Sequence, residues 1–145
     1  MKLGRKKGIN LLELMIVVVI IGVLVGIAIP QYLNVVERQK ASEAVQLLGV
    51  LRQAQIRYYA ANGAFAGGAS SPCDTVGLDV DWSRSTDPTL AYFNQPQCAV
   101  VNPIVKMERI DNAAYGKYTL QIDEDGAISC VFDVAVPNGC TRLGY

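Results

Sequence analysis

A chain of 145 residues has room for one globular domain and an anchor, but not for two independent domains. Its 13 Lys and Arg balance its 13 Asp and Glu, but four of the positive charges lie before Gly8 (Lys2, Arg5, Lys6 and Lys7). The rest of the chain is therefore mildly acidic, which argues against nucleic acid as the main partner because no basic stripe could neutralise phosphates.

The N-terminal thirty residues combine a basic leader, residues 1–8, with an apolar run of membrane length. Apart from Glu13, every residue of the run 11–29 is apolar or glycine. About nineteen positions at about 1.5 Å each nearly match a hydrocarbon core of about 30 Å. No small-residue cleavage site follows the run, so a retained membrane helix is favoured over a secretory signal peptide. The basic leader predicts a cytoplasmic N-terminus with the body of the protein outside.

Beyond Pro30 the pattern becomes that of an amphipathic helix. Charged residues, Glu37 among them, lie largely off the apolar stripe, and Asn62-Gly63 is a plausible stop signal. One long helix over about residues 10–61 is predicted. The apolar positions recur at three- and four-residue spacing: Leu33, Ala41, Ala44, Val45, Leu48, Leu51 and Tyr58.

The C-terminal half predicts an irregular connection followed by a small antiparallel sheet. Residues 63–88 are rich in Gly, Ser, Pro and Asp, which is typical of a loop. Three or four strands are expected, and their apolar face could be covered by the helix, which gives an α+β fold. The candidate strands are "LAYF", "AVVNPIVKMERI" interrupted or confined to an edge by Pro103, "KYTLQID" and "AISCVFDVAV".

Four cysteines lie in the last half of the chain: Cys73, Cys98, Cys130 and Cys140. None forms a C-x-x-C pair, so zinc and thioredoxin-like chemistry are poorly supported. An even count after a membrane segment suits a compartment that permits disulfides, although buried free thiols in a cytosolic domain are the alternative. Of the three possible pairings, Cys73–Cys98 with Cys130–Cys140 is favoured because each closes a short loop.

Two features of the apolar run require an explanation. A charge at the centre of a membrane helix costs roughly 2.5–3.5 kcal/mol, so Glu13 needs a cationic partner or a position near the interface where it can snorkel. Gly22, Gly26 and Pro30 are spaced by four on one helix face. Because Pro30 cannot donate to the carbonyl of Gly26 and glycine weakens a helix, this segment is predicted to unwind most easily. Alternatively, the glycines form a close-packing face between membrane helices.

Together these residues resemble the N-terminus of type IV pilins and type IV pilin-like proteins: Gly8 after a basic leader, Glu13 five residues later, and Pro30 at the end of the apolar run. The resemblance implies that a prepilin peptidase cuts after Gly8 and methylates the new amino terminus of Ile9. It also implies that Glu13 pairs with the ammonium of Ile9, its own or a neighbouring subunit's, and so sets the register of assembly. The segment from Gly22 to Pro30 would be extended in the filament.

The resemblance implies a structural subunit, with no catalytic activity and no cofactor. The precursor would wait in the bacterial inner membrane, meet an assembly platform there, and join a homo-oligomeric surface filament that serves adhesion, motility or DNA uptake. Its parts would be the leader 1–8, a polymerisation helix 9–30, an amphipathic helix 31–62, and a domain of loop and antiparallel sheet, 63–145.

Two other classes stay open: a periplasmic pseudopilin of type II secretion and a simple membrane-anchored binding domain. Calcium at Asp123-Glu124-Asp125-Gly126 would favour the pseudopilin. The spacing of an EF-hand loop is missing, so we expect a plain hairpin turn and no metal site. The chain has no histidine and no recognisable nucleophile motif or phosphate loop, which argues against an enzyme.

Overall fold

The computed structural model describes residues 10–68, 71–73, 76–80, 91–110, 116–132 and 139–144. It divides into two compact units, Met1–Val36 and Glu37–Tyr145, and we call the second unit the head. The predicted leader, Gly8 and Ile9 lie outside the described residues.

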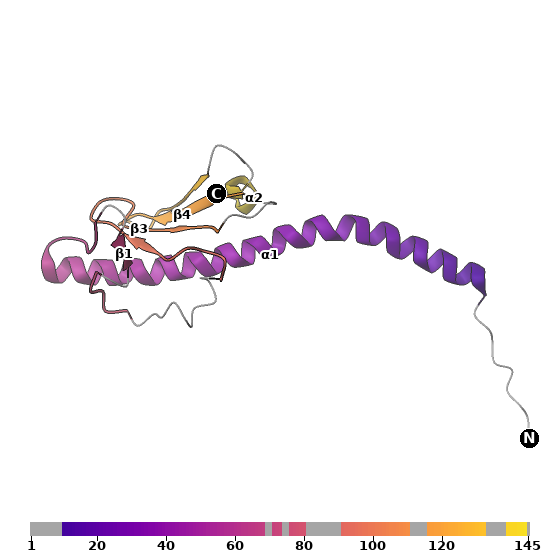
Figure 1. The fold of residues 1–145 in the computed structure, drawn as a ribbon, viewed down its shortest axis with the longest axis horizontal. Helices are drawn as coiled ribbons and strands as arrows, with labels where there is room; N and C mark the ends of the chain where they lie inside the picture. Colours follow the sequence, from indigo (N-terminus) through magenta and orange to yellow (C-terminus); the bar gives the residue numbers. More distant parts are fainter. Residues whose placement is uncertain are drawn as a thin grey trace, which may run out of the picture. The chain divides into compact units, whose positions relative to one another are not determined.

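One long helix, α1 (Leu11–Asn62), supplies residues to both units (Figure 1). It begins after Asn10, whose side-chain oxygen accepts a hydrogen bond from the backbone N–H of Leu12 at 3.4 Å. It ends at Gly63, which has a φ of 73° and donates its N–H to the carbonyl of Tyr59 at 2.8 Å. A glycine in the left-handed region is the usual helix stop, so the sequence signals predicted both ends to within one residue.

The head contains a five-stranded antiparallel sheet in the order β1-β2-β3-β4-β5, and a short helix follows it. Its elements are β1 (Ser71–Pro72), β2 (Gln97–Cys98), β3 (Val105–Glu108), β4 (Tyr118–Ile122), β5 (Ile128–Phe132) and α2 (Gly139–Leu143). The sheet lies along the C-terminal half of α1 (Figure 1). The α+β fold expected from the sequence is confirmed.

The strands differ from the prediction at the N-terminal edge of the sheet. Of the segment "LAYF", Leu90 lies outside the described residues; residues 91–93 form no strand, and Phe93 makes an isolated bridge with Arg109. The next predicted strand begins at Val105, beyond Pro103, so the proline interrupts the apolar stretch rather than lying within a strand. The two-residue strands β1 and β2 were not predicted, because two residues are too few for an alternation to be detected.

The core of the head lies between α1 and the inner face of the sheet. Inward side chains alternate along β3 and β4, and Met107 of β3 pairs with Leu120 of β4, which in turn pairs with Cys130 of β5. The buried members of this core are Ala41, Ala44, Leu48, Leu51, Cys73, Phe93, Cys98, Ile104, Val105, Met107, Tyr118, Leu120, Ile122 and Cys140.

Candidate assembly site

The apolar run at the start of α1 is uncovered in the single chain. Its large side chains between Leu11 and Ile29 are 45–74% exposed. By length and composition, this helix is also able to cross a membrane. An apolar surface of this size on a soluble protein marks a site that a membrane or another protein covers.

Glu13 occupies the first turn of α1, three residues after the N-cap Asn10. A carboxylate there interacts favourably with the N-terminal end of the helix dipole, so Glu13 also has a local reason for its position. Among the described residues Glu13 makes no ion pair. Its predicted partner, the amino group of Ile9, lies outside the described residues, so that pairing stays a prediction.

Gly22, Gly26 and Pro30 all lie within continuous α-helix. A Cβ built on either glycine would meet no atom within 4 Å. Among the residues that the structure describes, no neighbouring atom therefore requires glycine at these two positions. Both expected roles, close packing between helices and local unwinding, concern an assembled state and stay predictions.

Two disulfides join neighbouring parts of the head. Cys73, just after β1, pairs with Cys98 of β2 across 25 residues of sequence. Cys130 of β5 pairs with Cys140 of α2 across 10 residues. These are the two pairings that the sequence favoured.

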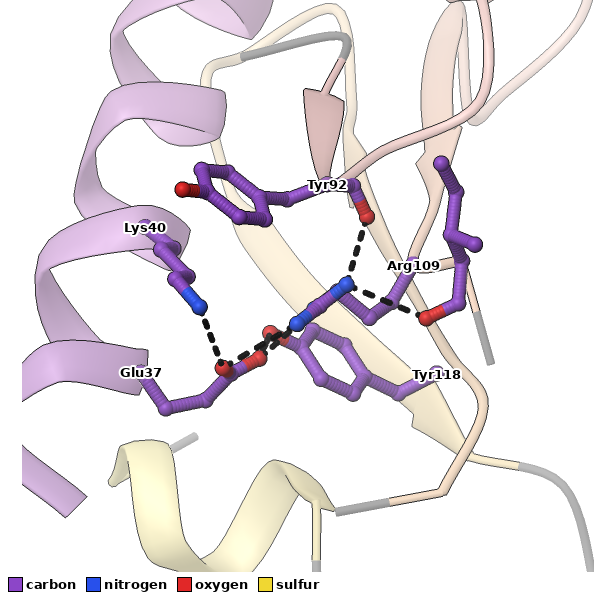
Figure 2. A network of polar contacts seen from close by, with 6 residues as sticks. Glu37, Lys40, Tyr92, Arg109 and Tyr118 are labelled. Atoms are coloured by element: carbon purple, nitrogen blue, oxygen red, sulfur yellow. Dashed lines mark hydrogen bonds and ion pairs between the residues drawn. The ribbon is translucent and has the colours of Figure 1, made fainter. Parts of the chain in front are cut away.

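A buried ion pair fixes α1 against the sheet (Figure 2). Arg109, just after β3, donates from Nε to Oε1 of Glu37 at 2.7 Å and from Nη2 to Oε2 at 3.2 Å. The two side chains are 4% and 3% exposed, respectively. The expectation that Glu37 lies off the apolar stripe of the helix is therefore wrong. It lies four residues before Ala41, in register with the buried stripe, and α1 presents it to the sheet.

The other groups around this pair satisfy its remaining hydrogen-bonding capacity. The Tyr118 hydroxyl donates to Oε1 of Glu37 at 2.9 Å, and the Lys40 ammonium lies 3.9 Å from Oε2. Nη1 of Arg109 donates to the carbonyl of Tyr92 at 2.8 Å, as Figure 2 shows. A buried charge pair is tolerated only when further hydrogen bonds satisfy its remaining donors and acceptors, and Tyr118, Lys40 and the Tyr92 carbonyl do so here.

The pKa values of this network follow from the balance between burial and pairing. Burial alone would raise the pKa of Glu37, but the hydrogen bonds and charge of Arg109, with Tyr118 and Lys40, hold that pKa below its usual range. Burial would lower the pKa of Arg109, and Glu37 raises it instead. Burial, and then the Glu37 charge, raise the pKa of Tyr118. Glu37 and Arg109 are thus both ionised at neutral pH, with the tyrosine as a neutral donor.

The turn between β4 and β5 is held from the helix by an arginine. Arg52 donates to the Glu124 carbonyl from Nε at 3.0 Å and from Nη2 at 2.6 Å. The Glu124 N–H donates to the Asn102 side-chain oxygen at 3.0 Å. In the part of the chain that the structure describes, no cluster of three or more His, Cys, Asp or Glu could hold a metal ion. The segment is a hairpin turn whose central carbonyl already receives a cationic side chain.

The chain is similar to individual proteins of one family, although no model of a known protein family matches it. It is 36% identical over 103 residues to the type IV major fimbrial protein FimA of Dichelobacter nodosus, covering 68% of this chain and 64% of that protein. It is 39% identical over 112 residues to the type IV major pilin PilE of Neisseria gonorrhoeae, covering 77% and 64%, respectively.

The chain is also 45% identical over 60 residues to the fimbrial protein EcpC of Eikenella corrodens. This shorter match covers 41% of this chain and 39% of that protein. The chain thus spans less than two thirds of the length of each of these relatives. The resemblance first seen in Gly8, Glu13 and Pro30 extends through most of the sequence, and the chain belongs to the family of type IV pilins and type IV pilin-like proteins.

Proposed function

We propose that this chain is a structural subunit, a major or minor pilin, of a type IV pilus-like surface filament, assembled through the apolar part of α1. One observation carries the proposal: the large side chains between Leu11 and Ile29 are all at least 45% exposed on the isolated chain. The names of the relatives, which are major pilins and fimbrial proteins, support the same role.

The apolar run supports storage in a membrane before assembly, because a bilayer covers it as well as a helical bundle does. Burying one Val, Leu or Ile side chain is worth about 1.5–3 kcal/mol relative to water. Moving that side chain from lipid to a bundle gains little, since lipid tails are as apolar as leucine. Close packing and polar pairing must therefore favour the filament over the bilayer.

Glu13 supplies the polar pairing in this proposal. Cleavage after Gly8 would remove the leader's four lysine and arginine charges and leave one α-ammonium on Ile9. A carboxylate and an ammonium in a low-dielectric bundle attract strongly when both are present, and either alone is costly. A subunit would therefore dock in the one axial register that brings its Glu13 or Ile9 to the complementary group.

The segment from Gly22 to Pro30 would give the filament its compliance. The helix is continuous there in the single chain, but Pro30 removes one backbone hydrogen bond and each glycine weakens the helix by roughly 0.8–1.0 kcal/mol relative to alanine. In a filament we expect this segment to extend while the flanking helix stays packed.

The proposed partners act in turn on the chain as it matures and assembles. A prepilin peptidase would process Gly8-Ile9 and methylate Ile9, and an inner-membrane assembly platform would add the subunit to a filament of identical or related pilins. The head would then be displayed on the cell surface for adhesion, motility or DNA uptake. Its two disulfides suit that exposed location.

Mass spectrometry of the N-terminal peptide, from membranes and from filaments sheared off the cell surface, tests the proposal. We expect a peptide that begins at Ile9, carries one methyl group, and is abundant in the sheared fraction. The same processed peptide confined to membranes would favour a pseudopilin. A peptide that still begins at Met1 would favour a simple anchored domain and contradict the filament role.

Replacing Glu13 by valine tests the pairing separately. Glu13→Val should insert into the membrane at least as well as the unchanged chain, because it removes a charge. The amount of Glu13→Val in the sheared filament fraction should fall. Glu43→Val is the matched control, since it removes an exposed carboxylate from the same helix within the head. Equal incorporation of Glu13→Val and the control, measured beside the unchanged chain, would refute the pairing.

A further inference from the structure

The outer face of the sheet, turned away from α1, carries a small polar cavity. Its volume is about 170 Å³, and side chains from β2, β3, β4 and the segment before β2 surround it. The lining residues are all polar: Asn94, Gln95, Gln97, Lys106, Glu108 and Thr119.

The strand register explains why these side chains converge. Lys106 and Glu108 alternate with the buried Val105 and Met107, so they point outward from β3. Gln97 of β2 is the cross-strand partner of Lys106. The floor of the cavity is therefore a grid of outward side chains about 5 Å apart across strands and about 7 Å apart along them.

A second pair of residues completes this grid. Thr119 of β4 is the cross-strand partner of Glu108. Asn94 stands at the edge, where its backbone N–H donates to the Glu108 carbonyl at 2.7 Å. The grid crosses three strands, a breadth of about 10 Å at about 5 Å for each spacing, which is enough for one pyranose ring.

Part of the cavity wall is fixed and part has open hydrogen-bonding capacity. Glu108 is held by the Lys117 ammonium and by the Asn94 side-chain amide, which donates to Oε2 at 3.2 Å. The side chains of Gln95, Gln97 and Thr119 make no hydrogen bond within the described residues. Two primary amides and one hydroxyl thus face the cavity with donors and acceptors available.

We propose that this cavity is a binding site for a neutral saccharide. Sugar hydroxyls both donate and accept hydrogen bonds, and the amides of Gln95 and Gln97 and the hydroxyl of Thr119 do the same. The Glu108 carboxylate adds an acceptor whose position is fixed. The lining contains one lysine and a glutamate that is paired with Lys117, and it lacks the arginine fork that commonly binds phosphate, which disfavours a strongly anionic ligand. The lining contains no apolar residue, which disfavours a lipid or an apolar peptide.

The expected affinity for one chain is low. A few hydrogen bonds made in competition with water give a dissociation constant on the order of 1 mM. Display of many heads along a filament would raise the avidity by roughly 10²–10⁴ without any new contact. That gain alone depends on the proposed filament role; the site itself, and its test on single chains, do not.

Nuclear magnetic resonance titration of the full ¹⁵N-labelled chain in phosphocholine micelles tests the site, because these micelles carry no sugar headgroup. The probes are D-galactose, D-mannose and N-acetyl-D-glucosamine, with open-chain sorbitol as a control polyol. We expect at least one sugar to cause saturable shifts of backbone amides at residues 94–97, 106–108 and 119, and sorbitol to cause none.

Two cavity variants, Gln97→Ala and Thr119→Val, should each weaken the binding of that sugar at least tenfold. Ser129→Ala is the matched control, since Ser129 of β5 lies beyond Gln121 on the same outer face but outside the cavity lining. Unchanged amide spectra away from the substitution establish that each variant is folded.

Four results would overturn the proposal: no saturable shift with any of the three sugars, equal shifts with sorbitol, unchanged affinity in both cavity variants, or shifts at these amides that depend on protein concentration without sugar. The last result would assign the face to a second copy of the chain.

Discussion

Removing Arg109 should destabilise the head more than most single substitutions, because it leaves a buried carboxylate without its main partner. Glu37 is 3% exposed and receives two hydrogen bonds from Arg109. In Arg109→Met it keeps only the Tyr118 hydroxyl at 2.9 Å and the Lys40 ammonium at 3.9 Å. Breaking a buried pair in this way costs about 3–5 kcal/mol. The two remaining groups place the expected loss near the lower end, at about 3 kcal/mol.

The double variant Glu37→Leu with Arg109→Met separates the cost of an orphaned charge from the net value of the pair. Replacing both members of a buried pair by apolar side chains of similar volume is often close to neutral. We therefore expect the double variant to recover more than half of the loss seen in Arg109→Met alone. That comparison distinguishes an electrostatic penalty from simple loss of packing.

Urea unfolding of the full oxidised chain in zwitterionic micelles, followed by near-ultraviolet circular dichroism, measures these free energies. Arg57→Met is the control, since Arg57 forms an exposed pair with Asp79 and its loss should not measurably change the unfolding midpoint. The reasoning would be refuted by a loss below about 1 kcal/mol in Arg109→Met, or by a double variant no more stable than Arg109→Met.

Three further predictions concern the head. Pairing holds the pKa of Glu37 below its usual range despite burial. The stabilisation that Glu37 contributes is therefore present above about pH 4.3 and is lost as pH falls through the lower folded-state pKa. In urea titrations at several pH values, the free energy of unfolding of the double variant should lack this contribution to the decrease in acid. Gly67→Ala should lower the free energy of unfolding by about 3 kcal/mol, because φ is 122° and the new Cβ would lie 2.5 Å from the Cys98 carbonyl oxygen. Gly77→Ala, at φ 73° with open space around it, should lower it by about 1 kcal/mol. Equal urea midpoints for the two variants would contradict the clash. Removing the Cys130–Cys140 bridge by Cys130→Ser with Cys140→Ser should lower the free energy of unfolding by about 2.7 kcal/mol, from the entropy of a loop of 10 residues, and a change under 1 kcal/mol would indicate that α2 docks without it.

The parts of the fold that could be predicted are those with long periodic signals. The apolar run, the amphipathic stripe and the Asn62-Gly63 stop predicted α1 closely, and alternation predicted β4. The predicted last strand includes β5, and its end, residues 133–136, lies outside the described residues. The disulfide pairs followed from loop length. In each case many residues, or a strong geometric constraint, supported one local structure.

The buried ion pair could not be predicted by a rule that assigns charged residues to the solvated face. Its signal was present in the spacing: Glu37 precedes Ala41 by four residues, and Arg109 follows Val105 and Met107 at a spacing of two. Each charge therefore occupies an inward position of its element. The sequence of neither element shows which residue the other supplies. Only the packing of α1 on the sheet shows that two inward charges of opposite sign meet.

The saccharide cavity lacks even this signal, because it depends on register. Gln97, Lys106 and Thr119 come from three strands, and one strand is only two residues long. A shift of one residue in β3 would turn Lys106 and Glu108 inward and bring Val105 and Met107 to the surface. The outer face is therefore specified indirectly, by the inward residues that fix the register.

A buried polar residue lies at each end of the buried stripe of α1, and the one that contacts the sheet determines the axial position of the helix on it. The stripe between them, with Ala41, Ala44, Leu48 and Leu51, repeats at three and four residues and is compatible with more than one axial position. At one end Glu37 requires Arg109. At the other end the Gln55 side chain donates to the Ala66 carbonyl at 2.7 Å and accepts from the Ala66 N–H at 2.8 Å.

Sliding the helix along the sheet would separate Glu37 from Arg109 and leave two buried charges unpaired, at a cost of several kcal/mol. Gln55 acts locally, because Ala66 lies four residues beyond the end of α1, and it holds the start of the connection against the helix. The apolar stripe thus supplies attraction without register, and the Glu37–Arg109 pair supplies register. The proposed role of Glu13 applies the same principle to neighbouring chains, where an apolar helix gains its axial position from a single charge.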